Sequence, residues 1–154
     1  MKRFTSFSLF CMGTLVIAGL SFGQARVENK EVLQGLDKVR VVVERLRAEL
    51  EQDGLYASTL QKDIELKLTL AGIKVLSEEE CLKIPCVPDL YMHVDAFKHA
   101  QGYTYRIQLS LMEPVVVLRK RMQVAGTTFR MHDELGMTER LSEVREEARD
   151  IVDK

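Results

Sequence analysis

The stretch Ser58–Leu76, STLQKDIELKLTLAGIKVL, decides the predicted fold, because its pattern indicates a helix that ends at Gly72 and a strand directly after it. Glycine is favoured just past a helix end because it adopts a left-handed backbone without a Cβ clash. Ile73 and Val75 then alternate with Lys74, which is typical of a short strand. The apolar face of the helix recurs at helical spacing and consists of Leu60, Ile64, Leu68 and Ala71, widened by Leu66 and Leu70.

Two capping patterns flank this joint. Ser58 followed by Gln61 matches a capping box, in which two side chains satisfy unpaired backbone donors at a helix start. Ser77 followed by Glu80 is a second such pattern and predicts a short helical turn. The strand between the helices is therefore limited to Ile73–Leu76.

The segment before the helix allows two interpretations. The β-branched run VRVVV favours a strand over about Val39–Leu46, whereas Leu36–Leu50 also fits a heptad spacing of a helix. We prefer the strand, and Asp53-Gly54 then marks a turn. Strand, helix and the Ile73 strand would form a βαβ unit with two parallel strands.

The next part of the chain predicts a hairpin. Leu90–Phe97 alternates apolar and polar residues, and Tyr103–Leu111 alternates strictly, with both of its tyrosines on the apolar side. Gln101-Gly102 lies near the turn between them. The two segments should pair as antiparallel strands.

Four further features complete the domain. Glu113-Pro114 predicts either a tight bend or a bulge in one long strand. Val124–Met131 is the last predicted strand, and Asp133–Gly136 is a predicted loop. An apolar stripe then predicts a closing amphipathic helix; it consists of Leu141, Val144, Ala148, Ile151 and Val152.

Together these elements predict one two-layer α/β domain over residues 36–154, preceded by a polar lead-in over 26–35. We expect a mixed sheet of about five strands with two main helices on one face.

Residues 1–25 have the organisation of a signal peptide. Lys2 and Arg3 precede the apolar run Phe7–Leu20, and Gly23-Gln24-Ala25 places small residues where a signal peptidase cleaves, after Ala25. The protein is then periplasmic or secreted, with no stable membrane span after cleavage. The alternative is an uncleaved anchor, although the apolar run is short for a membrane span.

Composition and motifs argue against several functions. The formal net charge of −1 gives no reason to expect a nucleic-acid partner. The sequence contains no G-x-S-x-G, P-loop or H-E-x-x-H pattern. We therefore predict a protein that is not an enzyme and needs no cofactor.

Cys81 and Cys86 remain after leader cleavage, and an exported protein would allow them to form a disulfide. The bridge would close a small loop and stabilise the fold by about 2 kcal/mol. The alternative is a pair of buried, reduced thiols.

Two further groups suggest ligand chemistry. His93 and Asp95 share a strand face and His99 follows, so the three could form a metal or small-ligand site. The basic run Arg119–Arg121 could contact an anionic surface such as a phospholipid headgroup or peptidoglycan. For both groups, an ordinary solvated strand surface is the interpretation that we prefer.

The segments DIELKLTLAGIKVLSEEE (63–80), LYMHV (90–94) and YTYRIQLSL (103–111) resemble a group of small exported bacterial proteins of unknown function. This resemblance implies an exported protein and assigns no catalytic residue. The element order is also distantly similar in topology to the amino-terminal domain of TolB, an envelope assembly protein; fold alone does not imply function.

The expected function is therefore a non-enzymatic protein-interaction or envelope accessory protein, whose partner is an envelope protein. The alternative is a small-ligand or metal-binding module on the strand face of His93, Asp95 and His99.

Overall fold

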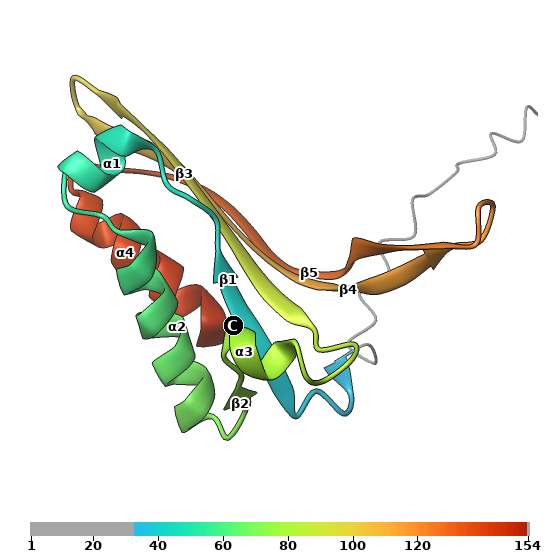
Figure 1. The fold of residues 1–154 in the computed structure, drawn as a ribbon. Helices are drawn as coiled ribbons and strands as arrows, with labels where there is room; N and C mark the ends of the chain where they lie inside the picture. Colours follow the sequence, from blue (N-terminus) through green and yellow to red (C-terminus); the bar gives the residue numbers. More distant parts are fainter. Residues whose placement is uncertain (1–32, 154) are drawn as a thin grey trace, which may run out of the picture.

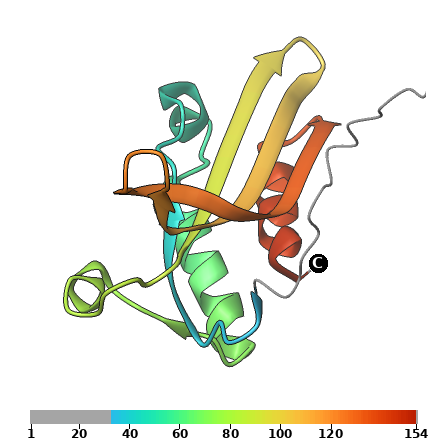
Figure 2. The ribbon, with the colours of Figure 1, turned by 90° about the vertical axis from the view of Figure 1, so that its right-hand side faces the viewer.

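The computed structural model describes residues 33–153, so the predicted leader and its cleavage after Ala25 lie outside the described residues. A five-stranded mixed sheet has the order β2-β1-β3-β4-β5, and helices α2 and α4 lie on one of its faces (Figures 1 and 2). This arrangement confirms the predicted single α/β domain. The elements in chain order are β1 (Lys38–Val43), α1 (Ala48–Gln52), α2 (Ala57–Leu70), β2 (Lys74–Val75), α3 (Glu78–Cys81), β3 (Asp89–His99), β4 (Gly102–Val117), β5 (Met122–Thr138), α4 (Leu141–Asp150) and the 3-10 helix η2 (Ile151–Asp153).

The predicted parallel pairing of the strands that flank α2 is confirmed. β1 pairs in parallel with β2 on one side and with β3 on the other, whereas β3–β4 and β4–β5 are antiparallel. β1 ends at Val43, before the predicted Leu46. The chain leaves the sheet there, and Leu46 and Leu50 are buried in the core around the short helix α1. Neither the long strand nor the heptad helix therefore describes this segment completely.

The joint after α2 has the predicted form. Gly72 adopts a left-handed φ of +83°. Its N–H donates to the carbonyl of Thr69 over 3.1 Å, and the N–H of Ile73 donates to the carbonyl of Leu68 over 2.9 Å. These two bonds define a Schellman motif, which satisfies the last carbonyls of the helix. Gly72 thus ends α2 and leads the chain into β2.

The start of α2 differs from the prediction. The residue that precedes the helix is Tyr56, which makes no capping bond through its side chain. Ser58 lies within the first turn, and Gln61 Nε2 donates to Glu65 Oε1 over 2.8 Å instead of closing a capping box. The helix starts earlier than the Ser58 pattern indicates, so the predicted first capping box is wrong.

The predicted wide apolar face of α2 is also wrong. Leu60, Ile64 and Leu68 are buried, but Leu66 is 61% exposed and Leu70 is 79% exposed. Only one stripe of the helix rests on the sheet, because no described element covers its outer side.

The second capping box is confirmed. Ser77 Oγ accepts the backbone N–H of Glu80 over 3.3 Å, and Glu80 Oε2 accepts the backbone N–H of Ser77 over 2.9 Å. α3 therefore starts directly after the β2 segment, as predicted.

The Glu113-Pro114 segment continues one long strand, so it is not a tight bend. Register irregularities lie between Leu109 and Ser110 and between Leu111 and Met112, and in each case β5 contributes the extra residue. Pro114 lies past the end of β3, where β4 has an edge, and an edge is where a sheet tolerates proline.

The predicted loop Asp133–Gly136 is wrong, because these residues belong to β5 and pair with β4. Gly136 lies opposite Tyr105, and a Cβ on it would come within 2.4 Å of the tyrosine ring. The residue types that suggested a loop are explained by the sheet: the glycine makes room for the ring, and Asp133 binds across the strands to Arg106.

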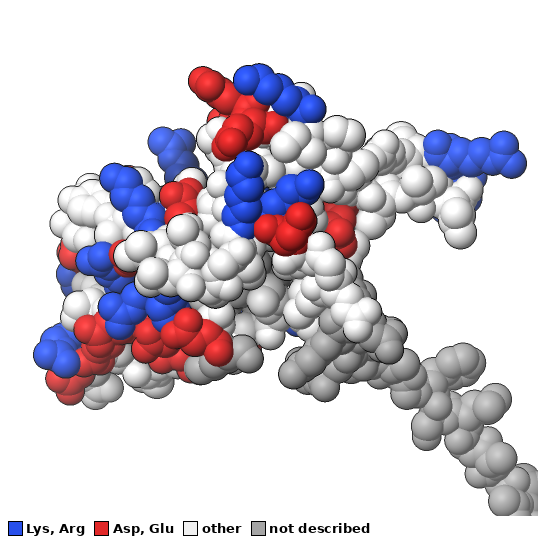
Figure 3. Space-filling view, turned by 90° about the horizontal axis from the view of Figure 1, so that it is seen from below, with Lys and Arg blue, Asp and Glu red and all other residues white. Residues whose placement is uncertain are grey.

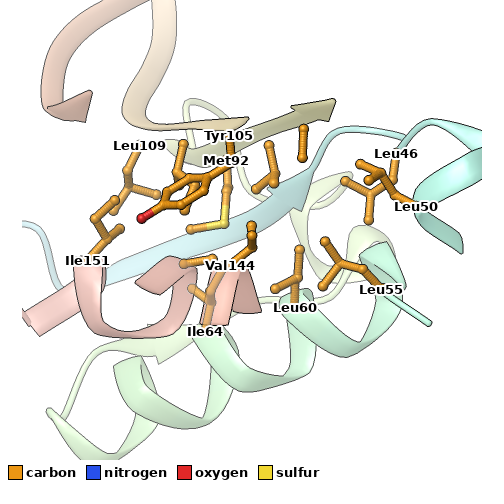
Figure 4. Close-up of a cluster of buried hydrophobic side chains, with 14 of the residues drawn as sticks. Leu46, Leu50, Leu55, Leu60, Ile64, Met92, Tyr105, Leu109, Val144 and Ile151 are labelled. Carbon is orange, nitrogen blue, oxygen red and sulfur yellow. The ribbon is translucent and has the colours of Figure 1, made fainter. Parts of the chain in front are cut away.

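The core lies between the helices and the sheet (Figure 4). Met92, Ile107, Leu109 and Val144 are fully enclosed at 0% exposure. The predicted inward position of both tyrosines of β4 and the apolar stripe of the closing helix are confirmed.

β4 and β5 continue beyond the rest of the sheet as a two-stranded arm. The pairing of β3 with β4 ends at Asp89 opposite Met112. Past that point, Glu113–Val117 pairs only with Met122–Gly126. We call residues 113–126 the arm; Figure 1 shows it projecting from the body of the domain.

Candidate functional site

The face of the sheet opposite α2 and α4 carries a set of interlinked polar side chains. Arg40 of β1 binds Asp89 of β3 through two bonds of 2.8 and 2.7 Å. Arg106 of β4 binds Asp133 of β5 in the same bidentate way, over 2.9 and 2.8 Å. Bidentate arginine–carboxylate pairs are strong and directional, so this face is held in a fixed arrangement.

The Asp133 carboxylate is the most strongly perturbed acid of this face. The hydrogen bonds from Arg106 lower its pKa to about 2, with a further contribution from Gln108 Nε2 at 3.0 Å. Asp133 therefore stays ionised across the whole neutral range. Its hydrogen bonds link β4 to β5, which is a structural role, and nothing in its environment indicates proton transfer.

Glu44 gathers a second cluster at the end of β1. Its Oε2 accepts the hydroxyl of Tyr91 over 2.6 Å and lies 2.6 Å from Nδ1 of His93. The hydrogen bond from Tyr91, and after it the contact with His93, lower the pKa of Glu44. The bond between Tyr91 and Glu44 also raises the pKa of Tyr91 to about 12. A hollow of about 430 Å³ beside the cluster is also bordered by Gln108 and Arg130.

The three residues of the predicted metal or small-ligand site do not form one cluster. His93 contacts Glu44, and Asp95 lies 3.6 Å from Nε of Arg47. His99 uses Nδ1 to accept the N–H of Gln101 over 3.2 Å. Among residues 33–153, no three histidine, cysteine, aspartate or glutamate side chains are grouped so as to hold a metal ion.

Cys81 and Cys86 both border one cleft of about 490 Å³, which lies between the α3 turn and the base of the arm. Both thiols are free in the structure. Cys86 has a left-handed φ of 60°, and its side chain is exposed. The predicted disulfide stays a prediction.

β5 is an edge strand of the sheet, and two of its apolar side chains are exposed. Leu135 is 75% exposed and Met137 is 69% exposed. The register places them opposite Arg106 and Thr104, on the face of the sheet opposite α2 and α4. Phe97 of β3 shares that face, is 52% exposed and lies under the Arg47 guanidinium, with 4.3 Å from Cζ to the ring centre.

The predicted basic run Arg119–Arg121 occupies the turn at the tip of the arm, and all three side chains are exposed. No helix among the described residues is long and apolar enough to cross a membrane.

Comparisons with protein-family models, with curated proteins and with solved structures gave no match for this chain.

Sequence reasoning missed Glu44 as the shared partner of Tyr91 and His93, and it missed Leu135 and Met137 as an exposed apolar pair. The alternation of Glu134, Leu135, Gly136 and Met137 gave a strand signal, but the glycine and the acids beside it suggested a loop. Glu44 gave no signal, because it is 49 residues from His93 along the chain.

Proposed function

We propose that this chain is an exported, non-enzymatic protein that binds an extended segment of an envelope protein along the β5 edge. The proposal rests on one observation above all: the outer side of β5 has no strand partner among the described residues. An unpaired edge offers a row of N–H and C=O groups to an incoming strand.

The segment His132–Thr138 is the part of this edge that suits strand addition. It pairs with β4 in regular register, without a bulge, and contains neither proline nor lysine. Proline, lysine and bulges are among the devices that protect a free edge from pairing, as are other charged side chains. The two acids of the segment, Asp133 and Glu134, are paired within the chain with Arg106 and His132. This segment of the edge contains no proline, lysine or bulge.

The side chains of the edge favour an apolar partner segment. Leu135 and Met137 project from the same face of β5, and Phe97 lies on that face two strands away. An added strand with apolar residues at alternate positions would cover Leu135 and Met137 and remove their surface from water.

The test uses a photo-crosslinking residue at Met137, and Leu70 of α2 serves as the control position because it is exposed to a similar degree. We expect the Met137 probe to trap one partner in cells and the Leu70 probe not to trap it. The substitution L135K, combined with the probe at position 137, should abolish the crosslink.

The trapped peptide, made synthetically, should bind the purified chain and slow amide exchange in 132–138. Equal trapping from Leu70, or exchange protection confined to another element, would refute strand addition at β5.

A small polar ligand in the hollow beside Glu44 is the second candidate. Its support is the convergence of Tyr91 and His93 on one carboxylate oxygen at the border of that hollow. Stoichiometric bound ligand or metal that is lost in H93A would favour this function over partner binding. The separate contacts of His93, Asp95 and His99 count against a metal ion shared by all three.

A further inference from the structure

The tip of the arm differs in charge from the rest of the chain. Arg119, Lys120 and Arg121 are consecutive, and no acidic residue occurs from Pro114 to His132 in a chain with 23 acidic residues. Arg121 adopts a left-handed φ of 48°, a position where glycine or asparagine is the usual residue. Figure 3 shows basic side chains gathered at the end of the projecting arm, which is otherwise free of charge on this side.

Both faces of the arm carry apolar side chains, and the polar residue Gln123 lies opposite Val116 on one of them. Val115 lies opposite Val124 and Val117 opposite Met122, and these pairs share one face. Val116 lies on the other face and is 59% exposed. Next to the cations, Met122 is 51% exposed and Leu118, in the turn, is 87% exposed.

We propose that the tip of the arm, residues 117–122, docks onto an anionic phospholipid surface. The three cations would contact headgroup phosphates while Leu118 and Met122 enter the boundary between headgroups and acyl chains. Basic residues beside exposed apolar ones are the combination that binds such a surface. An acidic protein groove would equally attract the cations, but apolar side chains on both faces of the hairpin suit a medium that surrounds the tip.

The depth of insertion is limited by the backbone of the arm. Past the end of β3, both strands of the arm have an outer edge without a strand partner among the described residues. Unpaired N–H and C=O groups are not tolerated in the hydrocarbon region. The turn and its side chains therefore enter the interface, and the strands remain in the headgroup layer and in water.

Docking of the tip does not require the proposed binding at the β5 edge, but it would orient that edge relative to the lipid surface. Met122 lies at one end of β5, and Met137 lies near the other end of the same strand. A chain docked by its tip would hold the segment His132–Thr138 away from the lipid, where a partner could reach it.

The test uses the absence of tryptophan from the chain. The variant L118W introduces a single emission probe at the tip, and L70W, at a comparably exposed site on α2, is the matched control. With vesicles of phosphatidylcholine and phosphatidylglycerol, we expect a blue shift for L118W alone. The shift should vanish with pure phosphatidylcholine vesicles and weaken at high salt.

Charge variants test the role of the cations. The triple variant R119Q/K120Q/R121Q, built on L118W, should bind the anionic vesicles on the order of 100-fold more weakly, because each cation near such a surface contributes roughly fivefold. R45Q/K62Q/K83Q removes the same charge from exposed sites elsewhere and should bind nearly as well as the parent.

Three results would overturn the proposal: no shift of L118W with anionic vesicles, an equal shift for L70W, or equal weakening by the two triple variants. Capture of an acidic protein by a crosslinker at position 118, without any vesicle shift, would reassign the tip to a protein partner. None of these results depends on binding at β5.

Discussion

Replacement of Gly72 by alanine isolates the energetic cost of the backbone conformation that ends α2. Gly72 has a φ of +83°, and a Cβ built on it would have no atom within 4 Å. The penalty therefore comes from the left-handed backbone and not from a clash. That conformation costs an L-residue about 1–2 kcal/mol, and the reduced entropy of the unfolded chain offsets about 0.4–1 kcal/mol of it.

We expect G72A to lower the free energy of unfolding by about 1 kcal/mol. G72N should lose less, because asparagine tolerates the left-handed region, and G72V should lose more, because its branched Cβ does not. The assay is equilibrium unfolding in urea, in which the midpoint should fall while the slope m stays constant.

Gly54 provides a matched control, since it has a φ of +98° and equally open surroundings, so G54A should cost a similar amount. Wild-type stability in G72A, or a valine variant more stable than the alanine variant, would refute this account. A G72V protein that folds normally but loses partner binding would show that Gly72 serves the function directly.

Three further predictions concern the sheet and the cysteines. The D133N variant should be less stable than wild type above pH 4, and this difference in stability should vanish as the pH falls toward 2, because the arginine partner of Asp133 lowers its folded-state pKa to about 2. Urea titrations at several pH values measure the difference. A difference that stays constant with pH would contradict a lowered pKa of Asp133. The free energy of unfolding of the G136A variant should be lower by about 1–3 kcal/mol, since its Cβ would come within 2.4 Å of the Tyr105 ring. The same substitution should cost less in a Y105A background, and an unchanged cost would exclude the ring as the cause. In protein purified from an oxidising compartment, Cys81 and Cys86 should form a disulfide. The intact mass should then be lower by two hydrogens, and the melting temperature should fall in dithiothreitol. Full labelling of both thiols without reductant would exclude the bridge.

The strand alternation of Tyr103–Leu111 and the apolar stripe of α4 were predictable because each depends on a repeat within a single element. The same reasoning failed for Leu66 and Leu70, since exposure depends on which side of α2 finds a neighbour. It also failed for Asp133–Gly136, where residues typical of loops are accommodated by the strand opposite.

The candidate sites were less predictable than the fold. His93 was identified as a polar residue of a strand face, but its partner Glu44 is 49 residues away. Likewise, the basic run was visible in the sequence, whereas its place at the end of an arm depends on β3 stopping opposite Met112 while β4 and β5 continue. Site geometry arises from strand register and relative strand length, which no local pattern reports.

The stretch from Ser58 to Leu76 contains features that the local sequence decides and features that only the tertiary structure decides. The sequence alone determined that a helix ends at Gly72, because a left-handed backbone and a Schellman motif are local requirements that glycine meets. The start of α2 and the faces that it buries were decided by the tertiary structure. Packing against the sheet selected Leu60, Ile64 and Leu68 and left Leu70 in solvent, because burial depends on neighbours that are distant in the sequence.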